Sequence, residues 1–240
     1  MAPSDEDFGY MTFWGSDIKE IRVCKSPSAA PGGPIGGKAH GYGDFNKTQI
    51  NDECQKQVIN HLDSLFTEKN LADVEITCEG EVFNCHQNIL SARSPVFLTM
   101  FRADMSEKHS KKVHIPDVRK EVFLEVLKFI YTGNVSSENS LKEHAREILA
   151  AANKYELDLL KKLCEAQLVS ALDASNCLDL LVLGDLHEAE KLKMVALDFV
   201  SMNFPSLVQQ DIYKDFIRQY PDLVFEVTKS VASKMESNNN

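Results

Sequence analysis

The most informative stretch of this sequence runs from residue 86 to residue 97 and reads His-Gln-Asn-Ile-Leu-Ser-Ala-Arg-Ser-Pro-Val-Phe. It predicts a short helix over 86–92. A second helix is expected to begin directly afterwards, because Ser94 suits the N-cap position and Pro95 suits the first helical position. The stretch therefore predicts two consecutive short helices that meet at Ser94.

The residues before this stretch alternate in polarity, as in a half-buried strand. Residues 73–78 read Asp-Val-Glu-Ile-Thr-Cys, Glu79-Gly80 predicts a turn, and residues 82 and 83 predict the returning strand of a hairpin. Further upstream, four apolar residues fall on one face of a predicted helix: Val58, Leu62, Leu65 and Phe66. This face packs either against its own domain or against another molecule, and the spacing alone does not separate the two interpretations.

The residues after this stretch predict one more short strand and then helices. Residues 113–115, Val-His-Ile, predict a strand that Pro116 ends. Asp117 is expected to cap a helix that reaches residue 132, with Gly133 as its left-handed stop. Residues 140–143 read Ser-Leu-Lys-Glu and predict a capping box for a further helix.

The last third of the chain is predicted to be helical throughout. Asp173 is expected to cap a helix that runs to about residue 186, and a second helix covers about 188–203. Pro205 and Pro221 punctuate two more helical segments.

These patterns predict an α+β fold, in which short strands with surrounding helices occupy residues 52–168 and an all-helical region occupies residues 170–235. Residues 1–50 differ in composition, because positions 26–43 are rich in Pro and Gly. Such a segment cannot offset its backbone entropy by burying apolar surface, so it predicts a flexible N-terminal segment.

The charge and the cysteines narrow the functional classes. The formal net charge of −10 disfavours binding to nucleic acid and to anionic membrane surfaces. The acidic N-terminus without an apolar core does not resemble a secretion signal, so we expect an intracellular protein of the nucleus, the cytoplasm or both. Cys78, Cys85, Cys164 and Cys177 lie among apolar residues and are expected to be buried thiols without disulfides or metal.

No pattern for catalysis stands out. The chain lacks a Gly-rich phosphate loop, a Gly-x-Ser-x-Gly element and a His-Glu-x-x-His element. Cys85-His86 is the one adjacent Cys/His pair, and adjacent side chains usually diverge. The seven histidines show no metal-ligand spacing. We therefore expect no enzymatic activity, no catalytic residue, no cofactor and no metal.

Several of these segments together resemble the BTB/POZ domain. They are Leu71-Ala72-Asp73-Val74, Phe83-Asn84-Cys85-His86, the stretch His-x-x-x-Leu-x-Ala-x-Ser-x-x-Phe, and Phe129-Ile130-Tyr131-Thr132-Gly133. The signature positions are Asp73, His86, Leu90, Ala92, Ser94 and Phe97. The chain is most similar to the speckle-type POZ group, and residues 181–187 and 220–224 resemble the helical 3-box and BACK extension of that group.

This resemblance implies a function that periodicity does not show. Members of the group dimerise and act as substrate adaptors of cullin-3 RING ubiquitin ligases. The positions that match the dimer core of the family are Val58, Leu62, Leu65 and Ile89. Cullin binding in the family uses a hydrophobic-x-Glu motif, which Met105-Ser106-Glu107 matches. The expected partners are therefore cullin-3, a second copy of the chain and unidentified protein substrates.

Two departures from the family pattern affect these expectations. Residues 1–50 are too few for the MATH domain that normally captures substrate, so mixed dimers with MATH-containing relatives are a further hypothesis. In addition, Gln87 stands where the family commonly has Lys near Asp73. Either Arg93 or a backbone N–H is expected to take the place of that cation.

A BTB scaffold or transcriptional co-regulator without a ligase role is the alternative function. BTB transcription factors usually add zinc fingers and positive charge, and this sequence shows neither feature. The Met105-x-Glu107 match and the helical extension favour the ligase adaptor.

Overall fold

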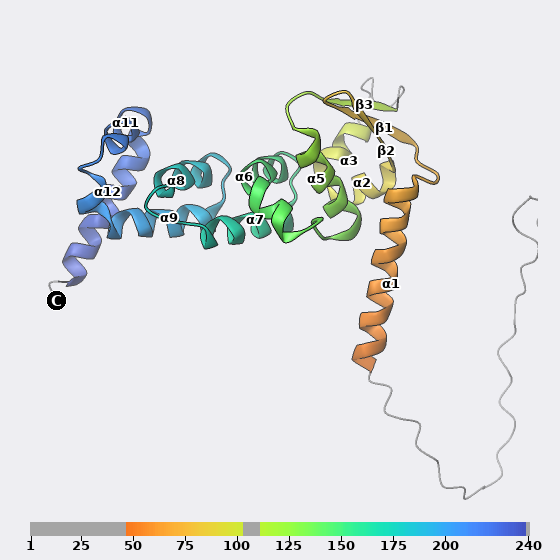
Figure 1. Ribbon diagram of the computed structural model, residues 1–240, viewed down its shortest axis with the longest axis horizontal. Helices are drawn as coiled ribbons and strands as arrows, with labels where there is room; N and C mark the ends of the chain where they lie inside the picture. Colours follow the sequence, from red (N-terminus) through yellow and green to blue (C-terminus); the bar gives the residue numbers. More distant parts are fainter. Residues whose placement is uncertain (1–46, 103–110, 239–240) are drawn as a thin grey trace, which may run out of the picture. The chain divides into compact units, whose positions relative to one another are not determined.

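The computed structural model describes residues 47–102 and 111–238, which belong to one compact unit. Figure 1 shows the order of the elements along this unit. They are α1 (Lys47–Glu68), β1 (Val74–Cys78), β2 (Glu81–Cys85), α2 (Gln87–Arg93), α3 (Pro95–Arg102), β3 (Lys112–Ile115), α5 (Lys120–Thr132), α6 (Glu138–Lys154), α7 (Asp158–Ser170), α8 (Cys177–Leu186), α9 (Glu190–Met202), α10 (Phe204–Leu207), α11 (Asp211–Gln219) and α12 (Pro221–Asn238). The predicted α+β fold with a helical region after it is confirmed.

The three strands form one small sheet in the order β2-β1-β3. β1 and β2 form the antiparallel hairpin that the sequence predicted, and Val74 lies opposite Cys85. Glu79 and Gly80 both adopt positive φ angles at its turn, where glycine carries no steric penalty. β3 pairs with β1 in parallel, so a crossover of α2 and α3 separates two adjacent strands.

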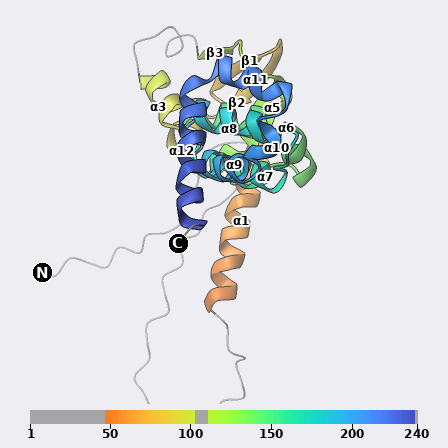
Figure 2. The same cartoon turned by 90° about the vertical axis from the view of Figure 1, so that its left-hand side faces the viewer.

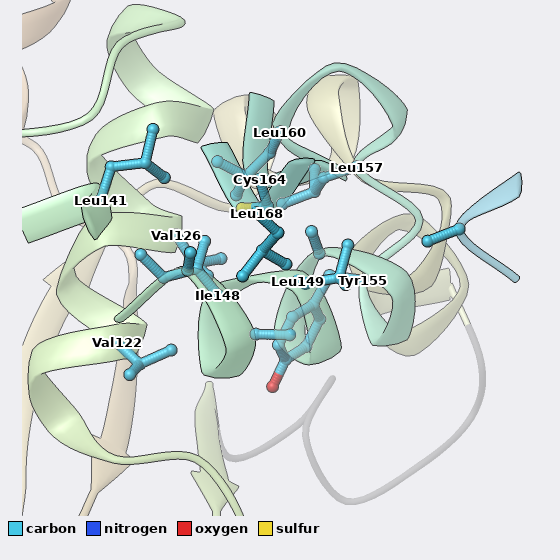
Figure 3. Packing of buried hydrophobic residues seen from close by; sticks show 14 of the residues in the cluster. Val122, Val126, Leu141, Ile148, Leu149, Tyr155, Leu157, Leu160, Cys164 and Leu168 are labelled. Carbon is cyan, nitrogen blue, oxygen red and sulfur yellow. The ribbon is translucent and has the colours of Figure 1, made fainter. Parts of the chain in front are cut away.

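The core of the strand-bearing part is packed between the sheet and helices α5, α6 and α7. Figure 3 shows apolar side chains of these three helices meeting in one cluster. Tyr155, between α6 and α7, stacks on Phe97 of α3 with ring centroids 5.0 Å apart. The backbone carbonyl of Tyr155 also accepts a hydrogen bond from Ser94 Oγ at 2.7 Å. These contacts join the start of α3 to the connection between α6 and α7.

Ser94 begins α3 as predicted, because its Oγ also accepts a hydrogen bond from the N–H of Phe97 at 3.3 Å. Gly133 is confirmed as the left-handed stop of α5, with a φ of 74° and its N–H bonded to the carbonyl of Phe129. Local sequence signals were sufficient at both positions, because the cap lies within four residues of the groups it satisfies.

The predicted cap of α5 is wrong. Arg119 occupies the N-cap position without a side-chain hydrogen bond. Glu79, from the hairpin turn, accepts the N–H of Lys120 at 3.0 Å instead. The carboxylate of Asp117 is bound by Lys154 Nζ at 2.6 Å, and this ion pair lowers the pKa of Asp117. The helix therefore obtains its cap from a distant part of the sequence.

The predicted capping box over 140–143 is also wrong. α6 begins earlier, with Ser137 as N-cap accepting the N–H of Ser140 at 3.0 Å. Ser140 donates its hydroxyl to the buried carboxylate of Glu125 at 2.6 Å. The hydroxyl of Ser140, which the local pattern assigned to a helix cap, is therefore bound to a carboxylate from another helix.

In the helical region α8 packs against α9, and α12 folds back onto α9. Asp173 accepts hydrogen bonds from the N–H groups of Ser175 and Asn176, so it shapes the turn before α8 and does not cap the helix itself. Gly184 of α8 lies against α9, where a Cβ atom would stand 2.7 Å from the nitrogen of Lys193. Figure 2 looks at the molecule from the end that carries α9 to α12. The predicted boundary between the strand-bearing part, residues 52–168, and the helical region, residues 170–235, stays a prediction.

Candidate protein-interaction surface

Helix α1 is held to the rest of the molecule through its second half. The ring of Phe66 lies 5.1 Å from the ring of Tyr131 on α5, and Leu65 packs partly against the core. Leu62 is half-buried, whereas Val58, one turn earlier, is 57% exposed. Part of the predicted apolar face therefore packs against the domain, and the part around Val58 is exposed to solvent.

Ile89, the fourth predicted dimer residue, lies on α2 and is half-buried against the same core. Helices α1 and α2 both pack on α5, so the four residues Val58, Leu62, Leu65 and Ile89 lie on two helices supported by one central helix. Because these residues are only partly buried, they leave apolar surface that a partner can cover. Burial of such surface stabilises an association by about 25 cal/mol for each Å². Their assignment as a dimer interface stays a prediction.

His86 fixes the corner where the hairpin meets α2. Its imidazole is buried, with Nδ1 2.7 Å from the hydroxyl of Tyr131 and Nε2 2.7 Å from the carbonyl oxygen of Asn70. A carbonyl only accepts hydrogen bonds, so the proton lies on Nε2 and the hydroxyl of Tyr131 donates to Nδ1. That hydroxyl also accepts the backbone N–H of His86 at 2.9 Å.

The same corner shows which group bonds to Asp73 in a chain that has Gln87 in place of the family Lys. The backbone N–H of Gln87 donates to Asp73 Oδ1 at 2.8 Å, and its side-chain amide reaches the carbonyl of Asp73 at 3.3 Å. Arg93 is occupied elsewhere, because its Nε donates to the carbonyl of Ile130 at 3.1 Å. Of the two replacements considered for the family cation, the backbone N–H is the one observed.

The signature residues mostly serve the fold of this corner. Leu90 and Phe97 are fully buried, His86 and Ser94 are nearly so, and Ala92 is exposed. The predicted cullin-binding residues Met105 and Glu107 lie outside the described residues. The structure therefore gives no geometry for that motif.

Four of the five described cysteines are buried, as predicted, and Cys54 on α1 is exposed. Burial raises the pKa of Cys85 and of Cys164 to about 12, so both thiols stay protonated at neutral pH. A protonated, buried thiol is a poor nucleophile. The adjacent Cys85 and His86 do not form a reactive pair, since both ring nitrogens of His86 are bound by other groups.

Two buried carboxylates were not found from the sequence. Glu125 accepts the N–H of Ser136 at 2.7 Å in addition to the hydroxyl of Ser140. Glu165 of α7 accepts the N–H of Leu192 in the first turn of α9 at 3.0 Å. A Glu at an apolar position of a helix is a weak signal for such a role. Both carboxylates hold helix starts and have a structural function.

The hollow between α7 and α9 is lined by charged residues of both signs. It has a volume of about 680 Å³ and is lined by Lys161, Lys162, Glu165 and Lys191 among others. Within residues 47–102 and 111–238, no group of three or more potential ligands gathers as in a metal site. No helix in the part of the chain that the structure describes is long and apolar enough to cross a membrane.

Residues 62–172 match the family model of the BTB/POZ domain. This segment is a BTB/POZ domain. Among solved structures, the BTB domain of zebrafish PATZ1 is similar at 21% identity and a TM-score of 0.40, over 49% of this chain and 92% of that chain. BTB domains are typically non-enzymatic modules that commonly dimerise and bind other proteins. Helices α8 to α12 lie beyond the matched residues.

Proposed function

We propose that this BTB protein is a dimerising adaptor of a cullin-3 RING ubiquitin ligase and that it mediates or modulates the ubiquitination of protein substrates. The observation that carries the proposal is a BTB/POZ domain whose first helix presents a partly exposed apolar face. Such a face suits a protein partner, since large exposed apolar patches are uncommon on monomeric proteins.

The proposed dimer contact consists of Val58, Leu62, Leu65 and Ile89. Two-fold dimers use the same patch on both subunits, and an apolar patch is self-complementary in this way. Changing Leu62 and Leu65 together to Asp places unpaired charges in the contact and is expected to yield monomers. Sedimentation equilibrium measures this change. Asn60→Asp with Ser64→Asp adds the same charge at exposed positions away from that face and is the matched control.

The proposed cullin contact consists of Met105 and Glu107. The support is its place in the sequence: the motif follows α3, which ends at Arg102, and precedes β3, as the family pattern requires. An apolar anchor beside one orienting polar group is the usual composition of an interface hot spot. The proposed adaptor therefore binds the cullin through this motif and uses its remaining surfaces for other proteins.

The test is a calorimetric titration of the full chain with the N-terminal domain of cullin-3. Truncating Met105 and Glu107 together to Ala is expected to weaken binding by about 2 kcal/mol, which is roughly 30-fold. The control is Lys120→Ala, an exposed change at the start of α5. Equal affinity of the double variant and the unmodified chain would remove the motif from the proposal. A lack of binding by the unmodified chain would favour the scaffold or transcriptional alternative.

A further inference from the structure

Helices α6 and α7 form a hairpin, and helices α8 and α9 form a second hairpin of the same geometry. Figure 1 shows the second pair following the first along the described unit. In the two turns, Glu156 and Glu188 adopt left-handed φ angles of 53° and 52°. Their N–H groups donate to the carbonyl oxygens of Asn153 and Asp185, at 3.2 Å in both turns. The second hairpin therefore repeats the first residue by residue around its turn.

The repeat extends to a side-chain contact. Lys161 Nζ donates to Asn153 Oδ1 at 2.8 Å, and Lys193 Nζ, at the corresponding place, donates to Asp185 Oδ1 at 2.8 Å. Lys193 also pairs with Glu226 of α12, the helix that packs on α9, at 2.9 Å. Within residues 47–102 and 111–238, Lys161 makes no ion pair, because its partner is the neutral amide of Asn153. The first lysine therefore lacks the carboxylates that the second one has.

The missing carboxylate can be traced to one position of α9. In stacked helical repeats each unit contacts its neighbour in the same way, and α12 packs on α9 as α9 packs on α7. Leu223 of α12 corresponds to Leu192 of α9, and both are buried. In this correspondence Val195 of α9 stands where α12 has Glu226, and both are half-buried. A valine forms no ion pair, so the charge of Lys161 is left without a partner at the contact between the hairpins.

The charge of Lys161 reaches the second hairpin and borders a hollow. Burial and then the charge of Lys161 lower the pKa of His187, which lies in the connection between α8 and α9. The hollow of about 680 Å³ between α7 and α9 is lined by three lysines: Lys161, Lys162 and Lys191. Four carboxylates also line it: Asp158, Glu165, Glu188 and Glu190.

Three of these four carboxylates are already compensated at helix starts. Asp158 and Glu190 lie in the first turns of α7 and α9, where the helix dipole offsets a negative charge. Glu165 accepts the N–H of Leu192 in the first turn of α9. The three lysines have no comparable compensation, so the hollow favours a further negative charge.

We propose that Lys161 binds a carboxylate side chain from an acidic segment of a partner protein, in the hollow between α7 and α9. The carboxylate takes the place at Lys161 that Glu226 takes at Lys193, and hydrogen bonds between charged groups are stronger than neutral ones. Met194, which is 63% exposed in the lining, offers an adaptable apolar contact to the neighbouring residues of the segment. This inference is independent of the proposed dimer and cullin contacts.

The test is a titration of the full chain with hexaglutamate, followed by two-dimensional NMR of the amide groups. Hexaglutamate is expected to shift the signals of α7 and of the first turn of α9. Lys161→Gln is expected to weaken binding about fivefold or more, because the probe loses a charge-assisted hydrogen bond. Lys214→Gln removes an exposed positive charge on α11 and is expected to leave the affinity within about twofold.

Three outcomes of this titration overturn the inference. Unchanged signals of α7 and α9 would show that the hollow takes no carboxylate. Equal affinity of the Lys161→Gln and Lys214→Gln variants would show that hexaglutamate binds through general charge. Tighter binding of hexalysine at the same signals would show that the hollow selects the opposite charge.

A second variant fills the site from within the chain. Val195→Glu places a carboxylate where the next hairpin has Glu226 and is expected to weaken hexaglutamate binding about fivefold or more, because Lys161 is then paired. Val195→Gln has the same shape without the charge and is expected to bind like the unmodified chain. Circular dichroism checks that both variants are folded. Equal binding by these two variants would overturn the inference. If Val195→Glu does not fold, the comparison of Lys161→Gln with Lys214→Gln decides it.

Discussion

At the scale of single residues, the corner around His86 shows why a signature can mark a fold without marking a reactive site. His86 and Tyr131 exchange hydrogen bonds that involve the imidazole, the hydroxyl and a backbone N–H. Burial raises the pKa of Tyr131, so its hydroxyl remains a donor throughout the physiological pH range. The pair joins strand β2 to helix α5 and, through Asn70, to the end of α1.

Removing the hydroxyl of Tyr131 is expected to destabilise this corner. Tyr131→Phe leaves the buried N–H of His86 without an acceptor and Nδ1 without a donor, at a cost of about 1–3 kcal/mol. Urea unfolding followed by circular dichroism measures the free energy of unfolding. The matched control is Tyr220→Phe, since Tyr220 is 37% exposed. Equal losses in the two variants would mean that the hydroxyl of Tyr131 has no special role.

At the scale of elements, helix starts depend on carboxylates that are distant in the sequence. Glu79 caps α5 across 41 residues, and Glu165 caps α9 across 27 residues. Both act because the first N–H groups of a helix have no partner within the helix. The predicted caps Asp117 and Ser140 are diverted to Lys154 and Glu125. Capping in this protein therefore also ties the elements to one another.

The contact between α8 and α9 gives a prediction for a pair of elements. Gly184→Ala would place a Cβ atom 2.7 Å from the backbone nitrogen of Lys193, which cannot rotate away as a side chain would. The helices must separate slightly, and overpacking of this kind costs about 1–3 kcal/mol. Thermal unfolding measures the loss. Leu186→Ala, at a side chain that is 68% exposed on the same helix, is expected to change stability little. A fully stable Gly184→Ala variant would contradict the close approach.

At the scale of the whole molecule, the strand-bearing part and the helical region share one helix. α7 packs against α6 on one side and against α9 on the other. Leu160, Cys164 and Leu168 of α7 are buried in a core that continues into α8 and α9. The predicted boundary near residue 170 therefore follows directly after an element that both parts use.

This shared helix predicts one cooperative unfolding transition for the full chain. Calorimetry is expected to show a single endotherm whose measured enthalpy equals the van't Hoff enthalpy. A form that ends at residue 172 is expected to melt at a lower temperature, because it exposes the face of α7 that α9 covers. Glu165 would then also lose the N–H of Leu192. Two separate endotherms would show that the two parts fold independently.

The sequence by itself determined the strands, the hairpin, the meeting of two helices at Ser94 and the stop at Gly133. Each depends on groups that lie within a few residues of one another, so a local pattern is enough. Only the tertiary structure decided which carboxylates cap α5 and α9, which group replaces the family cation at Asp73, and which part of α1 packs against α5. Those outcomes depend on which distant groups the fold brings within hydrogen-bond distance, and no local spacing contains that information.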